Sequence, residues 1–127
     1  MLFLTLRSKS LLSIATASLA MQLPGFAAVL LSDDFEAETP ALNYNAFANW
    51  DVTDGTVDLV VTGTFGLTGA GNFVDLDGSM SDAGVLTTKT SFTFDAGTTY
   101  TLTYDISGNQ RGGADDTVDV NVSAGAL

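Results

Sequence analysis

The sequence predicts an all-β protein, an antiparallel β-sandwich that follows an N-terminal signal helix. Three observations lead to this prediction. From Leu30 onward almost no segment has the 3.6-residue apolar period of a helix. Thr, Val, Phe and Tyr instead fill short runs of alternating apolar and polar residues, which clusters of Gly, Asp and Asn separate. Residues 1–27 have the pattern of a secretory signal peptide.

The leader has a positive start, an apolar middle and small residues at its end. Arg7 and Lys9 carry the charge, residues 11–23 are rich in Leu and Ala, and residues 24–28 read Pro-Gly-Phe-Ala-Ala. This order predicts cleavage after Ala27 and a secreted or cell-surface domain over residues 28–127. The alternative is an uncleaved signal anchor, because residues 10–32 carry no charge and about 20 apolar residues can span a bilayer. Polar residues and a proline interrupt that run, so we expect no stable membrane span after cleavage.

The clearest strand is residues 99–106, in which Tyr100, Leu102 and Tyr104 alternate with polar residues. Residues 57–61 and 118–123 repeat this alternation, and weaker strands are expected at 32–36, 47–52, 73–77 and 85–94. Gly and Asp predict turns at 54–55, 77–78, 95–97 and 108–113, and residues 63–71 are expected to form a flexible loop. Six or seven strands at this spacing indicate a sandwich. No closing strand follows residue 123, so we expect either a domain truncated at Leu127 or a small seven-stranded sandwich.

Composition and charge exclude several functions. The chain has no His and no Cys, which excludes a Ser-His-Asp triad, a thiol nucleophile, a zinc site built on His or Cys, and any disulfide. All 15 acidic residues lie after position 32, whereas only Lys89 and Arg111 are basic beyond the leader, so this part carries a net charge of −13. Such a surface repels phosphate backbones, and we therefore expect no nucleic-acid partner.

The order of short motifs along the chain produces a resemblance to a known group of proteins. The motifs are DFE at 34–36, WDV at 50–52, GTVDLV at 55–60, FVDLDGS at 73–79 and AGTTYTLTY at 96–104. Together they resemble the galactose-binding-like jelly rolls of bacterial exported surface proteins, with the choice-of-anchor proteins that often carry a PEP-CTERM sorting tail as the nearest group. The resemblance covers residues 33–123 and implies a jelly-roll sandwich of the kind found in carbohydrate-binding modules. The resemblance leads us to expect a second half of the jelly roll and a sorting tail as well, and these motifs include neither.

Four candidate ligand-binding residues lie close together in the sequence: Tyr44, Phe47, Asn49 and Trp50. Aromatic faces can stack on the apolar side of a pyranose ring, and Asn amides can bond its hydroxyls. For Trp50 the alternative is a core position between the two sheets, and for Tyr44 and Phe47 it is a solvated loop.

Acidic residues also gather at the start of the predicted mature domain, at Asp33, Asp34, Glu36 and Glu38. Oxygen ligands of this kind suit Ca²⁺, which takes about 6–8 of them. The resemblance implies a structural calcium near the first strand, with Glu36 as its ligand and Asp34 beside it; ordinary acidic surface is the alternative. Residues 75–82 lack the third acid and the final Glu of an EF-hand, so a hairpin turn is expected there. A turn is likewise expected at Asp115-Asp116.

These observations favour an exported, non-catalytic binding module that recognises extracellular or cell-wall polysaccharide, with a structural calcium as its candidate cofactor. Two alternatives stay open. One is a structural surface or adhesion domain without a small-ligand site. The other is a fragment of a glycoside hydrolase, which needs two carboxylates about 5 Å or about 7–9 Å apart.

Overall fold

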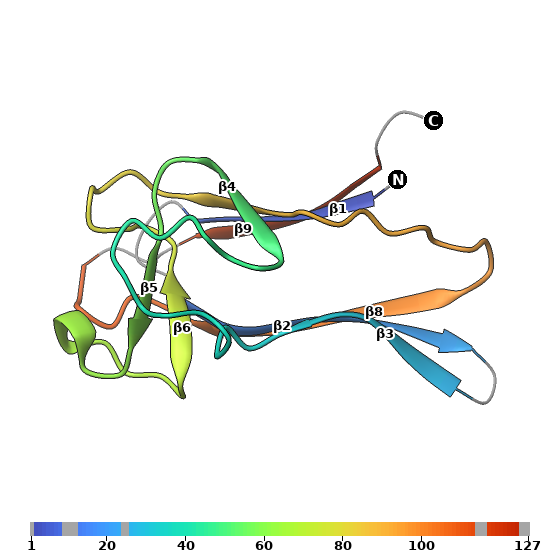
Figure 1. The fold of residues 1–127 in the computed structure, drawn as a ribbon, viewed down its shortest axis with the longest axis horizontal. Coiled ribbons are helices and arrows are strands. Elements are labelled where there is room, and N and C mark those ends of the chain that lie inside the picture. Colours follow the sequence, from blue (N-terminus) through green and yellow to red (C-terminus); the bar gives the residue numbers. More distant parts are fainter. Residues whose placement is uncertain (1, 9–12, 24–25, 114–116, 125–127) are drawn as a thin grey trace.

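The computed structural model describes residues 2–8, 13–23, 26–113 and 117–124, which form two antiparallel β-sheets (Figure 1). The first sheet has the order β4–β7–β1–β9, with bounds β1 Leu2–Ser8, β4 Trp50–Asp54, β7 Val85–Thr88 and β9 Val118–Ala124. The second has the order β3–β2–β6–β5, and β8 also pairs with β2; the bounds are β2 Ser13–Leu23, β3 Phe26–Asp33, β5 Asp58–Val61, β6 Asn72–Asp75 and β8 Thr99–Ser107. The predicted all-β sandwich is confirmed.

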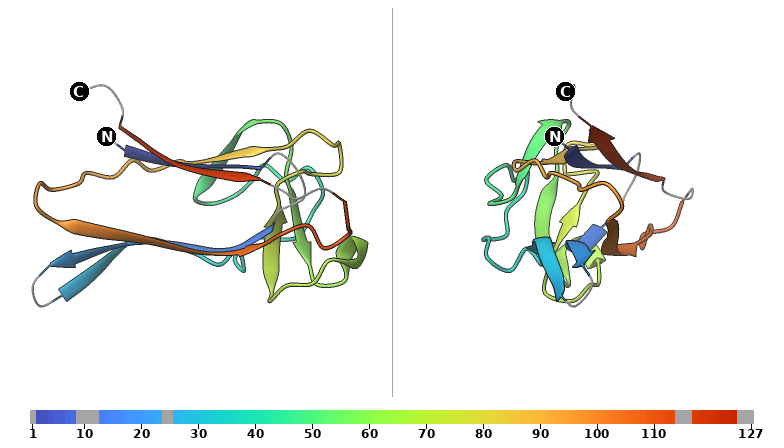
Figure 2. Two further views of the ribbon diagram at one scale, coloured as in Figure 1. Left: turned by 180° about the vertical axis from the view of Figure 1, so that it is seen from behind. Right: turned by 90° about the vertical axis from the view of Figure 1, so that its right-hand side faces the viewer.

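The two sheets face each other and enclose the core. In Figure 1, β1, β4 and β9 form the upper layer, β2, β3 and β8 the lower one, and β5 and β6 close the left end. Figure 2 shows the same two layers from behind and end-on. The largest fully buried side chains are Trp50, Phe35, Phe47, Phe73, Leu59, Leu76 and Leu86. Burial of such large apolar surfaces is the main force that holds the sheets together.

Residues 2–8 and 13–23 are β-strands, so the expectation of a signal helix in the leader is corrected. β2 pairs with β3 from Ala17↔Asp33 to Leu23↔Phe26, and with β8 from Ser13↔Ser107 to Gln22↔Thr99. An apolar run without a clear period fits a buried strand as well as a helix, and the neighbouring strands here satisfy its backbone groups. The predicted cleavage position after Ala27 lies within β3; cleavage itself stays a prediction.

Strands predicted from alternation agree best with the structure. β8, β9 and β5 match their predicted ranges to within one residue at each end, whereas β7 ends at Thr88 instead of continuing to residue 94. The strand expected at residues 32–36 ends at Asp33. Asp33 Oδ1 accepts the backbone N–H of Phe35 at 2.9 Å, and Asp34 Oδ1 accepts that of Glu36 at 3.1 Å. These two Asx turns bend the chain out of the sheet.

The expected hairpin at Asp77-Gly78 is a corner between the two sheets. Gly78 has the positive φ of +58° that a turn there requires. β6 before it belongs to the second sheet, however, and β7 after it belongs to the first, so these two strands do not pair. The Asp54-Gly55 turn crosses between the sheets in the same way, from β4 to β5.

Helical structure in the described residues is limited to one 3-10 turn, η1, at Thr64–Gly66 in the predicted loop 63–71. No described helix has the length and apolar character needed to cross a membrane.

Candidate functional site

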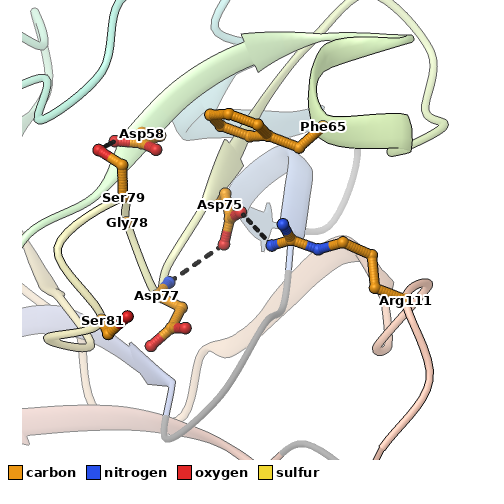
Figure 3. A pocket seen from close by; sticks show the side chains of 8 residues that line it. All are labelled: Asp58, Phe65, Asp75, Asp77, Gly78, Ser79, Ser81 and Arg111. Carbon is orange, nitrogen blue, oxygen red and sulfur yellow. Dashed lines mark hydrogen bonds and ion pairs between the residues drawn. The ribbon is translucent and has the colours of Figure 1, made fainter.

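A pocket of about 400 Å³ opens where β5, β6 and three loops meet (Figure 3). Its lining combines carboxylates, hydroxyls, one cation and one aromatic ring: Asp58, Phe65, Asp75, Asp77, Gly78, Ser79, Ser81 and Arg111. All of these residues follow the predicted cleavage position. Cleavage there would keep every lining residue but remove β1 and β2. Since β2 pairs with β6 at Ser13↔Asp75, the pocket geometry is that of the full chain.

Two aspartates form the floor of the pocket because of strand register. β5 and β6 run antiparallel with Asp58 directly opposite Asp75, and both residues are buried, with exposed fractions of 0% and 3%. Directly opposed side chains in such a pair lie on the same face of the sheet. Two carboxylates therefore share the buried end of the pocket.

Asp58 is held through only one of its two carboxylate oxygens. Oδ1 accepts the backbone N–H of Asn43 at 2.7 Å and the hydroxyl of Ser79 at 3.3 Å. Oδ2 is buried and has no hydrogen-bond partner among the residues that the structure describes. A buried acceptor without a donor costs free energy, so this atom is where a ligand would gain most.

Asp75 is held by a backbone N–H at one carboxylate oxygen and by a guanidinium group at the other. Its Oδ1 accepts the backbone N–H of Asp77 at 3.2 Å, and Oδ2 lies 3.6 Å from Arg111 Nη2, as Figure 3 shows. Burial raises the pKa of the Asp75 carboxyl and outweighs the Asp77 backbone N–H and Arg111, which lower it; Asp58 and Asp77 raise it further.

The direction of the Asp75 pKa shift predicts how stability depends on pH. A raised folded-state pKa means that the folded protein binds this proton more tightly than the unfolded chain does. The contribution of this proton to the free energy of unfolding is fully present below the ordinary pKa of an aspartate. It is lost as the pH rises through the higher folded-state pKa of Asp75. Urea unfolding from pH 3.5 to 7 should show the free energy of unfolding of the wild type falling relative to that of Asp75→Asn. A free energy of unfolding of the wild type that rises with pH relative to that of Asp75→Asn would contradict this prediction.

Phe65 and Arg111 form the rim of the pocket. Phe65 is 47% exposed, lies in η1, and has a φ of +53°, which is unfavourable for a bulky side chain. The guanidinium carbon of Arg111 lies 5.8 Å from the centre of the Phe65 ring. Residues held in sparsely populated backbone conformations cluster at functional sites, and this observation motivates a binding role for Phe65.

A side-chain clamp next to Arg111 positions the loop that carries it. Gln110 Oε1 accepts both the backbone N–H and the hydroxyl of Thr68, at 2.8 and 2.7 Å, and Gln110 Nε2 donates to Thr68 O at 2.7 Å. The loop after β8 is therefore tied to the loop that follows η1. This bonding holds Arg111 and Phe65 side by side on the rim.

The four ligand-binding residues predicted from sequence do not meet at one surface. Phe47 and Trp50 are fully buried, so neither ring has a face on which a sugar could stack, and the alternative of a core tryptophan describes Trp50 correctly. Asn49 Nδ2 and Trp50 Nε1 both donate to Asp33 Oδ2 at 2.9 Å. Tyr44 lines a separate pocket of about 250 Å³, which it shares with Asn43 and Asn45.

The two predicted calcium ligands are engaged with the backbone. Asp34 Oδ1 bonds the Glu36 N–H, and Glu36 Oε1 accepts the backbone N–H of Asn72. Within the part of the chain that the structure describes, no group of three or more acidic, His or Cys side chains is arranged to hold a metal ion. Whether calcium binds at Asp34 and Glu36 stays a prediction.

Sequence reasoning missed the pocket residues Asp58, Asp75, Phe65 and Arg111. The sequence did contain one indication of the two aspartates. Asp58 and Asp75 each lie within a run of apolar residues that is typical of a strand. An acid in such a run is unusual, since burial of an unpaired charge is costly.

Comparison with protein-family models, curated proteins and solved structures finds no match for this chain. The function must be argued from the site.

Proposed function

We propose that this protein is an exported, non-catalytic domain that binds carbohydrate in the pocket between β5, β6 and η1. The observation that carries the proposal is the pairing of an exposed aromatic ring, Phe65, with a buried acceptor that lacks a donor, Asp58 Oδ2. A pyranose ring has one apolar face and a rim of hydroxyl donors. It suits both groups at once.

The remaining lining adds to this chemistry. Arg111 and the hydroxyls of Ser79 and Ser81 can bond ring and hydroxyl oxygens, and a volume of about 400 Å³ falls within the range of small-ligand pockets. The net charge of −13 beyond the leader favours a neutral ligand over an anionic one. A neutral extracellular or cell-wall polysaccharide meets these conditions.

Export is supported by the leader pattern of residues 1–27 and by the resemblance to exported jelly-roll surface proteins. The protein recovered from the periplasm or medium of an expressing bacterium should have the intact mass of a chain that begins at Ala28. Material that carries Met1 and stays in the membrane fraction would favour the uncleaved anchor.

A glycan array followed by calorimetry on the best ligand tests carbohydrate binding. Phe65→Ala should weaken binding about 2–12-fold, because an aromatic contact contributes about 0.5–1.5 kcal/mol beyond its buried area. Tyr104→Ala is the matched control, since Tyr104 is also an exposed aromatic residue but does not line the pocket. If the folded wild type binds no glycan, the proposal fails and a structural surface domain becomes the better account.

One observation favours a second candidate, a carboxylate-based glycoside hydrolase. Burial raises the pKa of Asp75 beside a second carboxylate, Asp58, an arrangement that glycosidases use for a general acid. This candidate predicts turnover of chromogenic glycosides by the wild type and its loss in Asp75→Asn. Binding without turnover across a broad panel would retire it.

A further inference from the structure

The buried pair Asp58 and Asp75 carries more negative charge than its surroundings compensate. Like charges directly opposite each other in a sheet are destabilising, and burial strengthens their repulsion. Asp77 adds a third carboxylate to the pocket lining, whereas Arg111 is the only basic residue there. Arg111 pairs with Asp75 at 3.6 Å, and Asp58 has no ion pair in the described part of the chain.

The second basic residue beyond the leader is occupied elsewhere. Lys89 Nζ donates to the backbone carbonyl of Phe47 and lies 4.0 Å from Asp51 Oδ1. Among the described residues, the donors around Asp58 all act on Oδ1, which leaves Oδ2 buried and without a hydrogen-bond partner in a residue that lines the pocket. A small cation is the kind of ligand that satisfies such an atom and screens the opposed carboxylates together.

We propose that Asp58 Oδ2 and the carboxylate of Asp75 bind a divalent cation, Ca²⁺, at the floor of this pocket. The candidate metal ligands in the lining are all oxygen atoms, from the aspartates and from Ser79 and Ser81. Oxygen ligands suit a hard cation and not a transition metal. The two buried carboxylates provide fewer ligands than the about 6–8 that Ca²⁺ takes. Water or a bound molecule must complete the coordination sphere.

This small ligand set predicts weak affinity. A dissociation constant of about 10⁻⁴–10⁻³ M, the range of extracellular calcium modules, is expected. Phe65 lines the same pocket as the two aspartates. The positions of the coordination sphere that the protein does not fill would be open to a ligand in that pocket. Sugar hydroxyls can occupy them, so the cation would link the carboxylates to the carbohydrate; this last step rests on the proposed function, whereas cation binding does not.

Calcium binding is tested first without any sugar, by thermal unfolding and calorimetry of the full chain. Raising Ca²⁺ from zero, with chelator present, to 10 mM should increase the melting midpoint of the wild type by at least about 5 °C. Asp58→Asn should abolish at least nine-tenths of that shift. It keeps the Oδ1 acceptor for Asn43 and Ser79 and replaces only the unpartnered oxygen. Asp75→Asn provides a second variant if the first does not fold.

Glu36→Gln is the matched control, because it removes one acidic oxygen at the site that the sequence resemblance implies. It should keep the full calcium shift. The inference is overturned if the wild type shows no shift at 10 mM Ca²⁺, if Asp58→Asn keeps the shift, or if Glu36→Gln loses it.

Glycan binding with and without calcium then separates this inference from the proposed function. Loss of glycan binding in chelator, together with a calcium shift, supports both. Glycan binding that is unchanged in chelator supports the proposed function and overturns the bridging role of the cation. A calcium shift without any glycan binding retains the cation site and overturns the carbohydrate proposal.

Discussion

Replacement of Trp50 by alanine is expected to lower the free energy of unfolding by about 3–5 kcal/mol. Trp50 is fully buried between the sheets, so truncation removes a large apolar surface and leaves a cavity. It also removes the indole donor to Asp33 Oδ2 at 2.9 Å. Because small domains are stable by only about 5–15 kcal/mol, this single change should bring the protein close to unfolding at physiological temperature.

A milder pair of variants separates the packing of Trp50 from its hydrogen bond. Trp50→Phe keeps most of the apolar contact and loses the N–H donor, and Asp33→Asn changes the acceptor. The double variant should be less destabilised than the sum of the two single variants, with a coupling of about 0.5–3 kcal/mol. Urea unfolding of all four proteins measures this. Strict additivity would show that the Trp50–Asp33 contact contributes nothing to stability.

The second large effect is expected at Gly55, where alanine should cost at least about 2 kcal/mol. Gly55 has a φ of +58°, and an added Cβ would contact the carbonyl oxygen of Ala83 and lie 2.8 Å from that of Asp82. Both obstacles are backbone atoms, held close because Thr56 N–H donates to Asp82 O at 2.8 Å. No flexible side chain can move aside to relieve the clash.

Two other glycines separate the effect of backbone strain from that of crowding. Gly63 has a φ of +97° with nothing within 4 Å of an added Cβ, so Gly63→Ala should show strain alone, about 1–2 kcal/mol. Gly108 has neither a positive φ nor an atom within 4 Å of an added Cβ. Gly108→Ala should therefore change the free energy of unfolding by less than about 0.5 kcal/mol. Equal losses at Gly55 and Gly63 would contradict the close approach of the two loops. Denaturant unfolding of the three variants measures all of these values.

The strands were predictable to the extent that alternation marked them. Residues 99–106 alternate strictly and became β8 almost without change, whereas residues 85–94 have a weaker pattern and pair only as far as Thr88. The helix expected in the leader is the clearest failure at this level. Its apolar residues fit a signal helix and a buried strand equally well, and only pairing with β3 and β8 distinguishes the two.

The candidate site was hardly predictable. Trp50 and Phe47 were predicted to bind a ligand because they are aromatic residues in a polar stretch. In the structure both are buried in the core. Asp58 and Asp75 are 17 positions apart in the sequence, and no local pattern states that they oppose each other. Register between strands follows from how whole sheets pack, which is why the pocket emerged only from the structure.

By itself, the sequence determined the all-β class, the turns at residues 54–55, 77–78 and 95–97, the acidic character of the chain and the absence of chemistry based on His or Cys. These properties depend on residue type and on neighbours along the chain, and both can be read directly. The turn expected at Asp115-Asp116 lies outside the described residues. Only the tertiary structure decided that the Asp54-Gly55 and Asp77-Gly78 turns are corners between sheets, that Trp50 is core, and that two buried aspartates share one pocket. Each of these depends on contacts between distant segments, whose energies are set by the packing of the whole sandwich.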